Sequence, residues 1–316
     1  MAEALYGPNG FYTTAVRAGR RGDFLTSPEV GPLFGTVLAR WIDAEFVRLG
    51  EPADFLVVEV GAGPGTLARS ILSAAPQWRD RYVCVEVSEA QRASHPDGVI
   101  STHEMPTGFT GVVIANELLD NLSFRLAVFD GGWREAYVVQ QADGNAAEVL
   151  LPAPAEWAAW LPQRATHGSR APVQAAAREW VQQALTSLVA GTVLCIDYCT
   201  ATTAEVAAMP WREWLRTYRG HERGVHYLRE VGLQDITTQV CLDQLPEPYA
   251  VRDQAQFLAR WGLDELVDEG RRAWEAAAAR PDVAALKMRS RLREAESLCD
   301  LDGLGAFTVI EFRQDP

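Results

Sequence analysis

Three glycines behind a carboxylate make up the segment of this chain that is best suited to binding a ligand. The segment reads E-V-G-A-G-P-G-T-L over Glu59–Leu67. Its glycines are Gly61, Gly63 and Gly65. This G-x-G-x-G spacing differs from the G-x-G-x-x-G of dinucleotide-binding loops, because Thr66 stands where the third glycine would be. A Walker-type phosphate loop is excluded as well, since the only lysine of the chain is Lys287.

Two acids indicate which ligand this glycine loop takes. Glu59 precedes the loop, where it would repel a pyrophosphate but attract a ligand with positive charge. Glu86 lies near the end of the next apolar run, where an acid can accept hydrogen bonds from both hydroxyls of a ribose. S-Adenosylmethionine combines a ribose with an ammonium and a sulfonium, so the pattern predicts this cofactor. The glycines alone are equally compatible with a tight turn that binds nothing.

A second group of polar residues follows the apolar run Val112–Ala115. Asn116 directly follows this run, and from there its side chain can reach both cofactor and substrate. Glu117 and Asp120 are three positions apart, so in a following helical turn they lie on one face. Such a carboxylate pair can hold a planar guanidinium and aim one nitrogen at a methyl group. The alternative is that Asn116 and Asp120 cap the next helix.

His221, in T-Y-R-G-H, is a candidate for substrate binding or for accepting a proton near neutral pH. A lone histidine is nevertheless more often structural than catalytic.

We expect no metal site, because Cys195 and Cys199 have poor zinc spacing and no nearby histidines. The residues predicted to bind the cofactor, in the glycine loop, the start of the following helix and the strand ends, are Glu59, Gly61, Gly63, Gly65, Thr66, Leu67, Glu86 and Asn116.

The elements that position these residues alternate between strand-like and helical patterns. The strand-like runs are 55–60, 81–87, 111–115, 192–198 and 306–312. Alternation of this kind predicts an α/β fold with a parallel sheet and helices on both faces, and ligands then bind beyond the carboxyl ends of the strands. The polar residues at or next to these ends are Glu59, Glu86, Asn116 and Asp197.

Regions outside this alternation suggest three consecutive segments. We expect an N-terminal helical cap over 1–50 and a cofactor-binding core over 51–200. Within that core, two apolar runs around Asp130-Gly131-Gly132 predict an inserted β-hairpin over 124–139. The remaining core strands are expected over 201–316, with a helical accessory lobe at about 253–298.

Composition limits the class of protein. The chain has 316 residues, 48% of them hydrophobic, and a formal net charge of −13, which argues against nucleic acid as a partner. Its five cysteines are odd in number and mostly lie in apolar runs, so free thiols are expected. No stretch resembles a signal peptide or a membrane span, and we therefore expect a cytoplasmic location without membrane insertion.

Several motifs together resemble the MidA-like class I family of S-adenosylmethionine-dependent methyltransferases, which includes a mitochondrial complex I assembly-factor protein arginine methyltransferase. The resemblance extends over nearly the whole chain. Besides the glycine loop, it rests on G-P-N-G-F-Y, G-D-F-L-T-S-P-E, V-E-V-S, A-N-E-L-L-D-N-L, I-D-Y, T-Y-R-G-H and G-A-F-T-V-I. It implies a Rossmann-like sheet whose last strand is antiparallel. It also implies that a further cofactor-binding segment folds over the pocket, formed by Thr26, Ser27, Pro28 and Glu29.

The resemblance implies methyl transfer to a protein arginine, with Glu117, Asp120 and His221 as the catalytic residues. A homodimer is one possible state of the protein. Cys199 and Ser123 stand where the family commonly has glycine and proline, on the presumed acceptor side. Two other functions stay open. One is N- or O-methylation of a small molecule. The other is an assembly factor that binds the cofactor with little turnover. A partner surface for it is compatible with four tryptophans, although buried packing is the more common fate of this residue type: Trp157, Trp160, Trp211 and Trp214.

Overall fold

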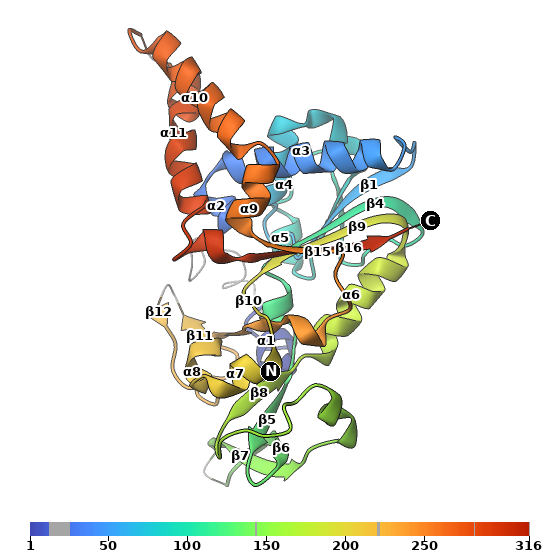
Figure 1. Cartoon of the computed structure of the whole chain (residues 1–316), viewed down its shortest axis with the longest axis vertical. Coiled ribbons are helices and arrows are strands. Elements are labelled where there is room, and N and C mark those ends of the chain that lie inside the picture. Colours follow the sequence, from blue (N-terminus) through green and yellow to red (C-terminus); the bar gives the residue numbers. More distant parts are fainter. Residues whose placement is uncertain (13–25, 143, 220–221, 281, 316) are drawn as a thin grey trace. The chain divides into compact units, whose positions relative to one another are not determined.

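A computed structural model describes residues 1–12, 26–142, 144–219, 222–280 and 282–315 (Figure 1). The chain divides into two compact units, each assembled from three separate stretches. The first, here the sheet unit, consists of Phe24–Asn116, Ala184–Ile196 and Pro248–Pro316. The second, here the insert unit, consists of Met1–Asp23, Glu117–Gln183 and Asp197–Glu247.

This division differs from the three consecutive segments expected from the sequence. The expected cap over 1–50 is divided, because Met1–Asp23 belongs to the insert unit and the following helices belong to the sheet unit. The expected core over 51–200 is interrupted after Asn116. The physical reason is that the chain beyond Asn116 builds further sheets with an apolar core of their own before it returns to the sheet unit.

The sheet unit is built on a seven-stranded sheet with the order β15-β16-β9-β4-β1-β2-β3. The strands β9, β4, β1, β2 and β3 pair in parallel, whereas β15 and β16 pair antiparallel. The inner strands are runs of buried apolar residues, as a parallel sheet covered on both faces requires. The bounds are β1 Phe55–Val60, β2 Tyr82–Val85, β3 Ile100–Thr102, β4 Phe109–Asn116, β9 Leu188–Asp197, β15 Ala250–Asp253 and β16 Thr308–Gln314. The predicted α/β fold is confirmed.

Helices before and after the strands complete this unit. They are α2 Ser27–Val30, α3 Pro32–Arg48, α4 Thr66–Ala74, α5 Glu89–Arg92, α9 Gln254–Arg260, α10 Leu263–Ala277 and α11 Val283–Leu298, while α6 Ala175–Ser187 leads back into it. The helices α10 and α11 lie side by side as a hairpin (Figure 1). Arg40 of α3 forms ion pairs with Glu265 and Glu269 of α10, and these ion pairs connect the hairpin to α3. The helical lobe expected over 253–298 is confirmed.

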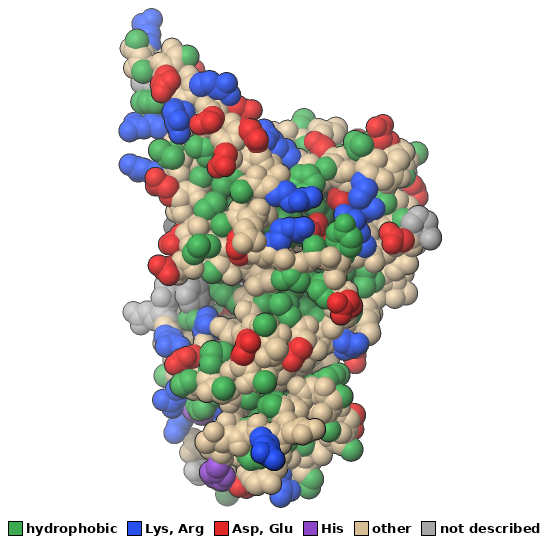
Figure 2. All heavy atoms as spheres, viewed as in Figure 1, with side chains coloured by type: hydrophobic (Ala, Val, Ile, Leu, Met, Phe, Trp, Pro, Cys, Tyr) green, Lys and Arg blue, Asp and Glu red, His purple; other side chains and the backbone are tan. Residues whose placement is uncertain are grey.

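Charged side chains of both signs cover the α10–α11 hairpin. On the face that Figure 2 shows, basic and acidic side chains are interspersed there. Arg291 of α11 pairs with Glu269 of α10, and Arg289 lies over the Trp274 ring. Basic residues of α11 therefore belong to a surface of mixed charge.

In its described residues, the insert unit contains three small sheets. Its strand orders are β7-β6-β5-β8, β12-β11-β13 and β10-β14. The expected hairpin is confirmed, because β5 and β6 pair antiparallel across the Asp130–Gly132 turn. The bounds are β5 Arg125–Phe129, β6 Trp133–Gln140, β7 Ala146–Pro152, β8 Arg170–Val173, β10 Cys199–Thr200, β11 Leu215–Arg219, β12 Glu222–Arg223, β13 Asp235–Thr238, β14 Val240–Cys241, α1 Ala2–Tyr6, α7 Thr203–Ala208 and α8 Trp211–Trp214.

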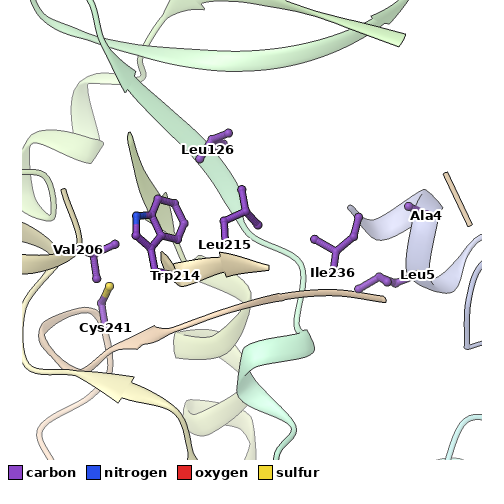
Figure 3. Packing of buried hydrophobic residues seen from close by; sticks show 8 residues of the cluster. All are labelled: Ala4, Leu5, Leu126, Val206, Trp214, Leu215, Ile236 and Cys241. Carbon is purple, nitrogen blue, oxygen red and sulfur yellow. The ribbon is translucent and has the colours of Figure 1, made fainter. Parts of the chain in front are cut away.

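A buried apolar cluster holds the insert unit together (Figure 3). It joins α1 to elements more than 100 residues later in the chain, through Ala4, Leu5, Leu126, Val206, Trp214, Leu215, Ile236 and Cys241. Trp214 is fully buried in this cluster and Trp157 is buried in a neighbouring one, so these two tryptophans are core residues and offer no partner surface.

Two further observations concern the whole described chain. Among its described helices, none has the length and the apolar character needed to cross a membrane. The five cysteines are free thiols, and Cys84, Cys195 and Cys241 are buried. The expectation of free thiols is therefore confirmed.

Candidate active site

The glycine loop between β1 and α4 has a backbone that only glycine adopts readily. Gly61, Gly63 and Gly65 have φ angles of 70°, 52° and 79°, all in the left-handed region. The N–H groups of Gly61 and Ala62 donate to the carbonyl of Val85 at 2.9 and 3.1 Å, which ties the loop to the end of β2. The loop thus presents bare backbone at the carboxyl edge of the sheet, where α/β proteins bind ligands.

Glu86 is fixed against this loop. Its Oε2 accepts the N–H of Gly63 at 2.9 Å, and its Oε1 accepts the N–H of Ser88 at 2.8 Å. A carboxylate oxygen can accept more than one hydrogen bond, so both oxygens can still receive ribose hydroxyls. The backbone therefore holds Glu86 ready in the position that the sequence predicts for a ribose acceptor.

Glu59 is a buried acid in β1, with only 5% of its surface exposed. Its Oε2 accepts the hydroxyl of Tyr82 at 2.7 Å. Burial raises the pKa of Glu59 to about 7, although the Tyr82 hydrogen bond and the charge of Arg69 oppose this shift. The ionised form is thus costly unless a positive charge approaches, which suits the cationic end of the predicted cofactor.

Two residues beside the loop were missed by the sequence analysis. Nε2 of His95 lies 2.9 Å from the carbonyl of Gly63, and its Nδ1 lies 2.8 Å from the hydroxyl of Ser101. The side-chain oxygen of Gln91 is buried and has no hydrogen-bond partner among the described residues. It lies 3.1 Å from where a β-carbon on Gly63 would be. Neither residue has a sequence signal beyond its place after Glu86.

The remaining residues predicted to bind the cofactor lie around the same loop. Thr26 caps α2 through a capping box with Glu29, and Pro28 occupies its first turn. The hydroxyl of the buried Ser27 donates to Gln254 at 2.9 Å. Helix α2 contacts α4, whose first turn contains the predicted Thr66 and the buried Leu67. The Thr26–Glu29 segment therefore packs near the helix that follows the glycine loop.

Asn116 ends β4, beside β1 in the sheet. The strand registers place Val60 next to Val85 on one side and next to Ala115 on the other. Glu59, Glu86 and Asn116 are each one position away along the chain from this row of paired residues, so all three lie near the carboxyl edge of the sheet. The structure brings these three predicted residues together at one sheet edge.

Glu117, the next residue, begins the insert unit in an uncommon conformation. Its φ is 52°, in the left-handed region that residues other than glycine rarely adopt. The following turn is a single 3₁₀ turn over Leu119–Asn121. The prediction that Glu117 and Asp120 share one face of a helical turn is therefore wrong, because the left-handed residue breaks the helical geometry before Leu119. Such strain is found disproportionately at functional sites.

Asp120 and Asp197 form a buried acidic pair in the insert unit. They are 3% and 1% exposed. Oδ2 of Asp197 accepts the N–H groups of Leu119 and Asp120 at 2.8 and 3.2 Å, and its Oδ1 accepts that of Tyr198 at 2.8 Å. Asp197, which the sequence analysis placed only at a strand end, thus anchors the turn that carries Asp120.

Burial and mutual repulsion disfavour the charged forms of these two acids. Burial raises the pKa of Asp120 well above its ordinary value, and the charge of Asp197 raises it further. Burial also raises the pKa of Asp197 to about 7, while Glu117 adds repulsion and the N–H donors oppose it. Glu117, Asp120 and Asp197 therefore form one electrostatically connected acidic cluster. His221, the third predicted catalytic residue, lies outside the described residues.

The sheet unit fits an adenosyl ligand that carries positive charge. The left-handed glycines leave backbone free for close approach, Glu86 is held for a ribose, and the oxygen of Gln91 is buried without a described partner. Glu59 is a buried acid whose carboxylate accepts a hydrogen bond from the neutral hydroxyl of Tyr82. A cation beside Glu59 would offset the cost of ionising it.

Comparisons with known proteins agree with this geometry. A family model described as "Putative S-adenosyl-L-methionine-dependent methyltransferase" matches residues 37–259. A Burkholderia thailandensis protein solved with S-adenosyl-homocysteine bound is similar in structure, with a TM-score of 0.83 and 26% identity, over 99% of this chain and 86% of that one. The bound ligand of that protein is the product form of the cofactor that the glycine loop predicts.

Curated relatives match over shorter stretches. The mitochondrial protein arginine methyltransferase NDUFAF7 homolog of Drosophila melanogaster is 30% identical over 181 residues, 46% of this chain and 41% of that protein. Human mitochondrial NDUFAF7, also named a protein arginine methyltransferase, is 40% identical over 78 residues, 24% of this chain and 18% of that protein. The chain thus spans about two fifths or less of the length of these two relatives. Because the family model matches most of the chain, the protein belongs to the MidA-like family of S-adenosyl-L-methionine-dependent methyltransferases.

Proposed function

We propose that this protein transfers a methyl group from S-adenosylmethionine to a guanidinium nitrogen of a protein arginine. The observation that carries the proposal is the acidic cluster of Glu117, Asp120 and Asp197, which begins at the residue directly after Asn116. Among the described residues, no arginine or lysine forms an ion pair with Asp120 or Asp197. A cationic acceptor would supply the missing positive charge. The names of the curated relatives support arginine as the acceptor.

The sheet unit would hold the cofactor. Glu86 would accept the ribose hydroxyls, the glycine loop would permit close approach, and Glu59 would pair with the ammonium group. When bound, S-adenosylmethionine supplies a methyl group on a positively charged sulfur. A nucleophile can attack this methyl carbon, and S-adenosyl-homocysteine is then the leaving group. The positions of Glu59 and Glu86 are fixed by hydrogen bonds before a ligand arrives, so little ordering is needed on binding.

Glu117 and Asp120 would orient the acceptor and receive its proton. A guanidinium has a pKa above about 12, so a carboxylate cannot deprotonate it before the reaction. The proton needs to leave only as the nitrogen attacks the methyl carbon, when its acidity rises. Burial disfavours the charged form of Asp120, so a cationic acceptor beside it would favour the ionised carboxylate that can receive the proton. Positioning would provide most of the acceleration, and assistance by His221 stays a prediction.

The Glu117→Gln variant tests the proposed role of the acidic cluster. It should bind S-adenosyl-homocysteine with wild-type affinity in calorimetry, because Glu117 is not among the cofactor-binding residues. Its transfer of labelled methyl groups to protein should fall by roughly a hundredfold, since the neutral amide cannot pair with a cation. Glu156→Gln, an exposed acid of the same unit, is the control and should keep full turnover. Full turnover of Glu117→Gln would exclude this residue from the mechanism.

Other properties of the protein remain predictions from the sequence. We propose a cytoplasmic location, a protein rather than a nucleic acid as the acceptor, and a homodimer as one possible state. The acidic net charge supports the choice against nucleic acid. Fractionation of the source cells and measurement of the solution mass would test the location and the oligomeric state.

A further inference from the structure

Asp120 has a buried oxygen atom that no described residue satisfies. Its Oδ2 accepts the hydroxyl of Thr237, but its Oδ1 is buried without a hydrogen-bond partner among the described residues. The side-chain oxygen of the neighbouring Asn121 is in the same condition within that part of the chain. Buried acceptors in proteins are nearly always satisfied. Two adjacent acceptors are thus available to a ligand that donates hydrogen bonds.

Asp235 lies beside Asp120. It begins strand β13, two positions before the Thr237 that contacts Asp120, so Asp235 and Thr237 occupy the same face of this strand. The charge of Asp235 accordingly raises the pKa of Asp120. A second carboxylate thus lies near Asp120.

Tyr12 is an aromatic residue that lies near both acids. Its hydroxyl forms a hydrogen bond with Asp235; burial raises the pKa of Tyr12, and the charges of Asp235 and Asp120 raise it further. Its ring stacks on that of Tyr6, with 5.6 Å between the ring centroids and 20° between the ring planes. The group therefore combines hydrogen-bond acceptors, negative charge and an aromatic ring.

These properties match a planar cation that donates several hydrogen bonds. A guanidinium has five N–H donors in a fixed plane, pairs with carboxylates and stacks on aromatic rings. An ammonium is a compact charge without a flat face, and a neutral amide lacks the charge that two crowded carboxylates need.

We propose that Tyr12 and Asp235 form, with Asp120, the recognition site for the guanidinium group of the methyl acceptor, an inference that rests on the proposed arginine methylation. Oδ1 of Asp120 and the carboxylate of Asp235 accept N–H groups of the guanidinium. The Tyr12 hydroxyl holds the Asp235 carboxylate in place, and the Tyr12 ring lies against the cation. Tyr12 and Asp235 are then residues that determine acceptor specificity, in addition to Glu117 and Asp120.

Binding of small probes to the full chain tests this site without turnover. Ethylguanidinium, ethylammonium and the neutral, planar ethylurea would each be titrated into the protein saturated with S-adenosyl-homocysteine, followed by NMR. Ethylguanidinium should bind most tightly and ethylurea least. Asp235→Asn should weaken ethylguanidinium binding roughly tenfold and Tyr12→Phe severalfold, because a charged hydrogen-bond partner and its support are lost.

Two controls accompany these variants. Asp130→Asn removes an exposed acid elsewhere in the insert unit and should leave probe binding unchanged. All variants should keep wild-type affinity for S-adenosyl-homocysteine and a wild-type unfolding temperature, which shows that they fold. Equal binding of ethylurea and ethylguanidinium, or wild-type probe affinity in both Asp235→Asn and Tyr12→Phe, would overturn the site.

Failure of the proposed function would give a different result. A labelled methyl group found on lysine or on a small molecule would overturn arginine methylation. Loss of ethylguanidinium binding in Asp235→Asn would still support the cation site in that case, because the binding measurement does not depend on the reaction.

Discussion

The backbone N–H of Gly63 donates to Oε2 of Glu86 at 2.9 Å, so the glycine loop and the predicted ribose acceptor hold each other in place. This contact connects the turn after β1 with the end of β2. It explains why an acid and a glycine far apart in the sequence act as one part of the site.

Replacing Glu86 by glutamine should weaken cofactor binding. The amide oxygen can still accept the Gly63 N–H, but the charge and one acceptor for the ribose hydroxyls are lost, which should cost about 1.5–3 kcal/mol of binding free energy. Calorimetry with S-adenosyl-homocysteine should therefore show affinity reduced at least tenfold. Glu89→Gln, an exposed acid three positions later, should bind like the wild type. Equal affinities for both variants would remove Glu86 from the cofactor site.

A valine at Gly63 should abolish cofactor binding. The φ of 52° is strained for any residue with a β-carbon, by about 1–2 kcal/mol, and that carbon would lie 3.1 Å from the Gln91 oxygen. Gly50→Val is the matched control, because Gly50 has a φ of 83° and nothing within 4 Å of its β-carbon position. Both variants should lose some stability in thermal unfolding, but only Gly63→Val should lose affinity. Undiminished binding by Gly63→Val would contradict the assignment of the loop.

Cofactor affinity should depend on pH through Glu59. Burial raises the pKa of this carboxyl to about 7, so it is largely neutral at pH 6 and largely ionised at pH 8. Only the ionised form pairs with an ammonium, and affinity for S-adenosyl-homocysteine should rise between these pH values. In Glu59→Gln the affinity should be lower and should lack this rise. Calorimetry at pH 6, 7 and 8 measures both, and a wild-type affinity that is constant over this range would count against the role of Glu59.

The same carboxyl should affect the stability of the free protein in the opposite direction. Because its folded pKa is raised above the ordinary 4.5, its contribution to stability is fully present below about pH 4.5 and is lost as the pH rises through about 7. A difference of 2.5 pKa units corresponds to about 3 kcal/mol. Without ligand, Glu59→Gln should therefore gain stability relative to the wild type as the pH rises from 5 to 8, as measured by denaturant unfolding.

Asp197→Asn should reduce turnover while sparing cofactor binding. The carboxylate of Asp197 anchors the turn of Leu119 and Asp120 through two backbone N–H groups, and one of its oxygens becomes an amide donor in the variant. Removal of its charge also lowers the pKa of Asp120, since Asp197 is one cause of the raised value. The acidic limb of the pH–rate profile should shift to lower pH. A profile that keeps its wild-type position would contradict the coupling of the two acids.

The sequence predicts well what depends on local pattern. The strand β1 begins and ends where its apolar run does, and the hairpin of β5 and β6 follows from the glycine turn at Gly131. The glycine spacing and Glu86 predict the cofactor class, because backbone conformation and charge at a strand end are properties of a few adjacent residues. The helical lobe over 253–298 is likewise visible in its periodicity.

Other features depend on contacts between distant residues, which a single sequence does not reveal. The insert unit is held together by a buried cluster that includes Leu5 and Ile236, and no local sequence pattern predicts that these two residues pack in one cluster. The left-handed conformation of Glu117 could not be expected from a glutamate. The hydrogen bonds from Leu119 and Asp120 to Asp197, and the positions of Gln91 and His95 beside the loop, became evident only in the structure.

The proposed methyl transfer to protein arginine is tested most directly by identifying the acceptor. The protein would be incubated with S-adenosylmethionine carrying an isotope-labelled methyl group and with a proteome from its own source, and labelled residues would be located by mass spectrometry. Labelled methylarginine is expected in a small set of proteins with the wild type, and its amount should fall by roughly a hundredfold with Glu117→Gln. Label that appears only on another type of residue or on a small molecule, with the wild type alone, would contradict the proposal.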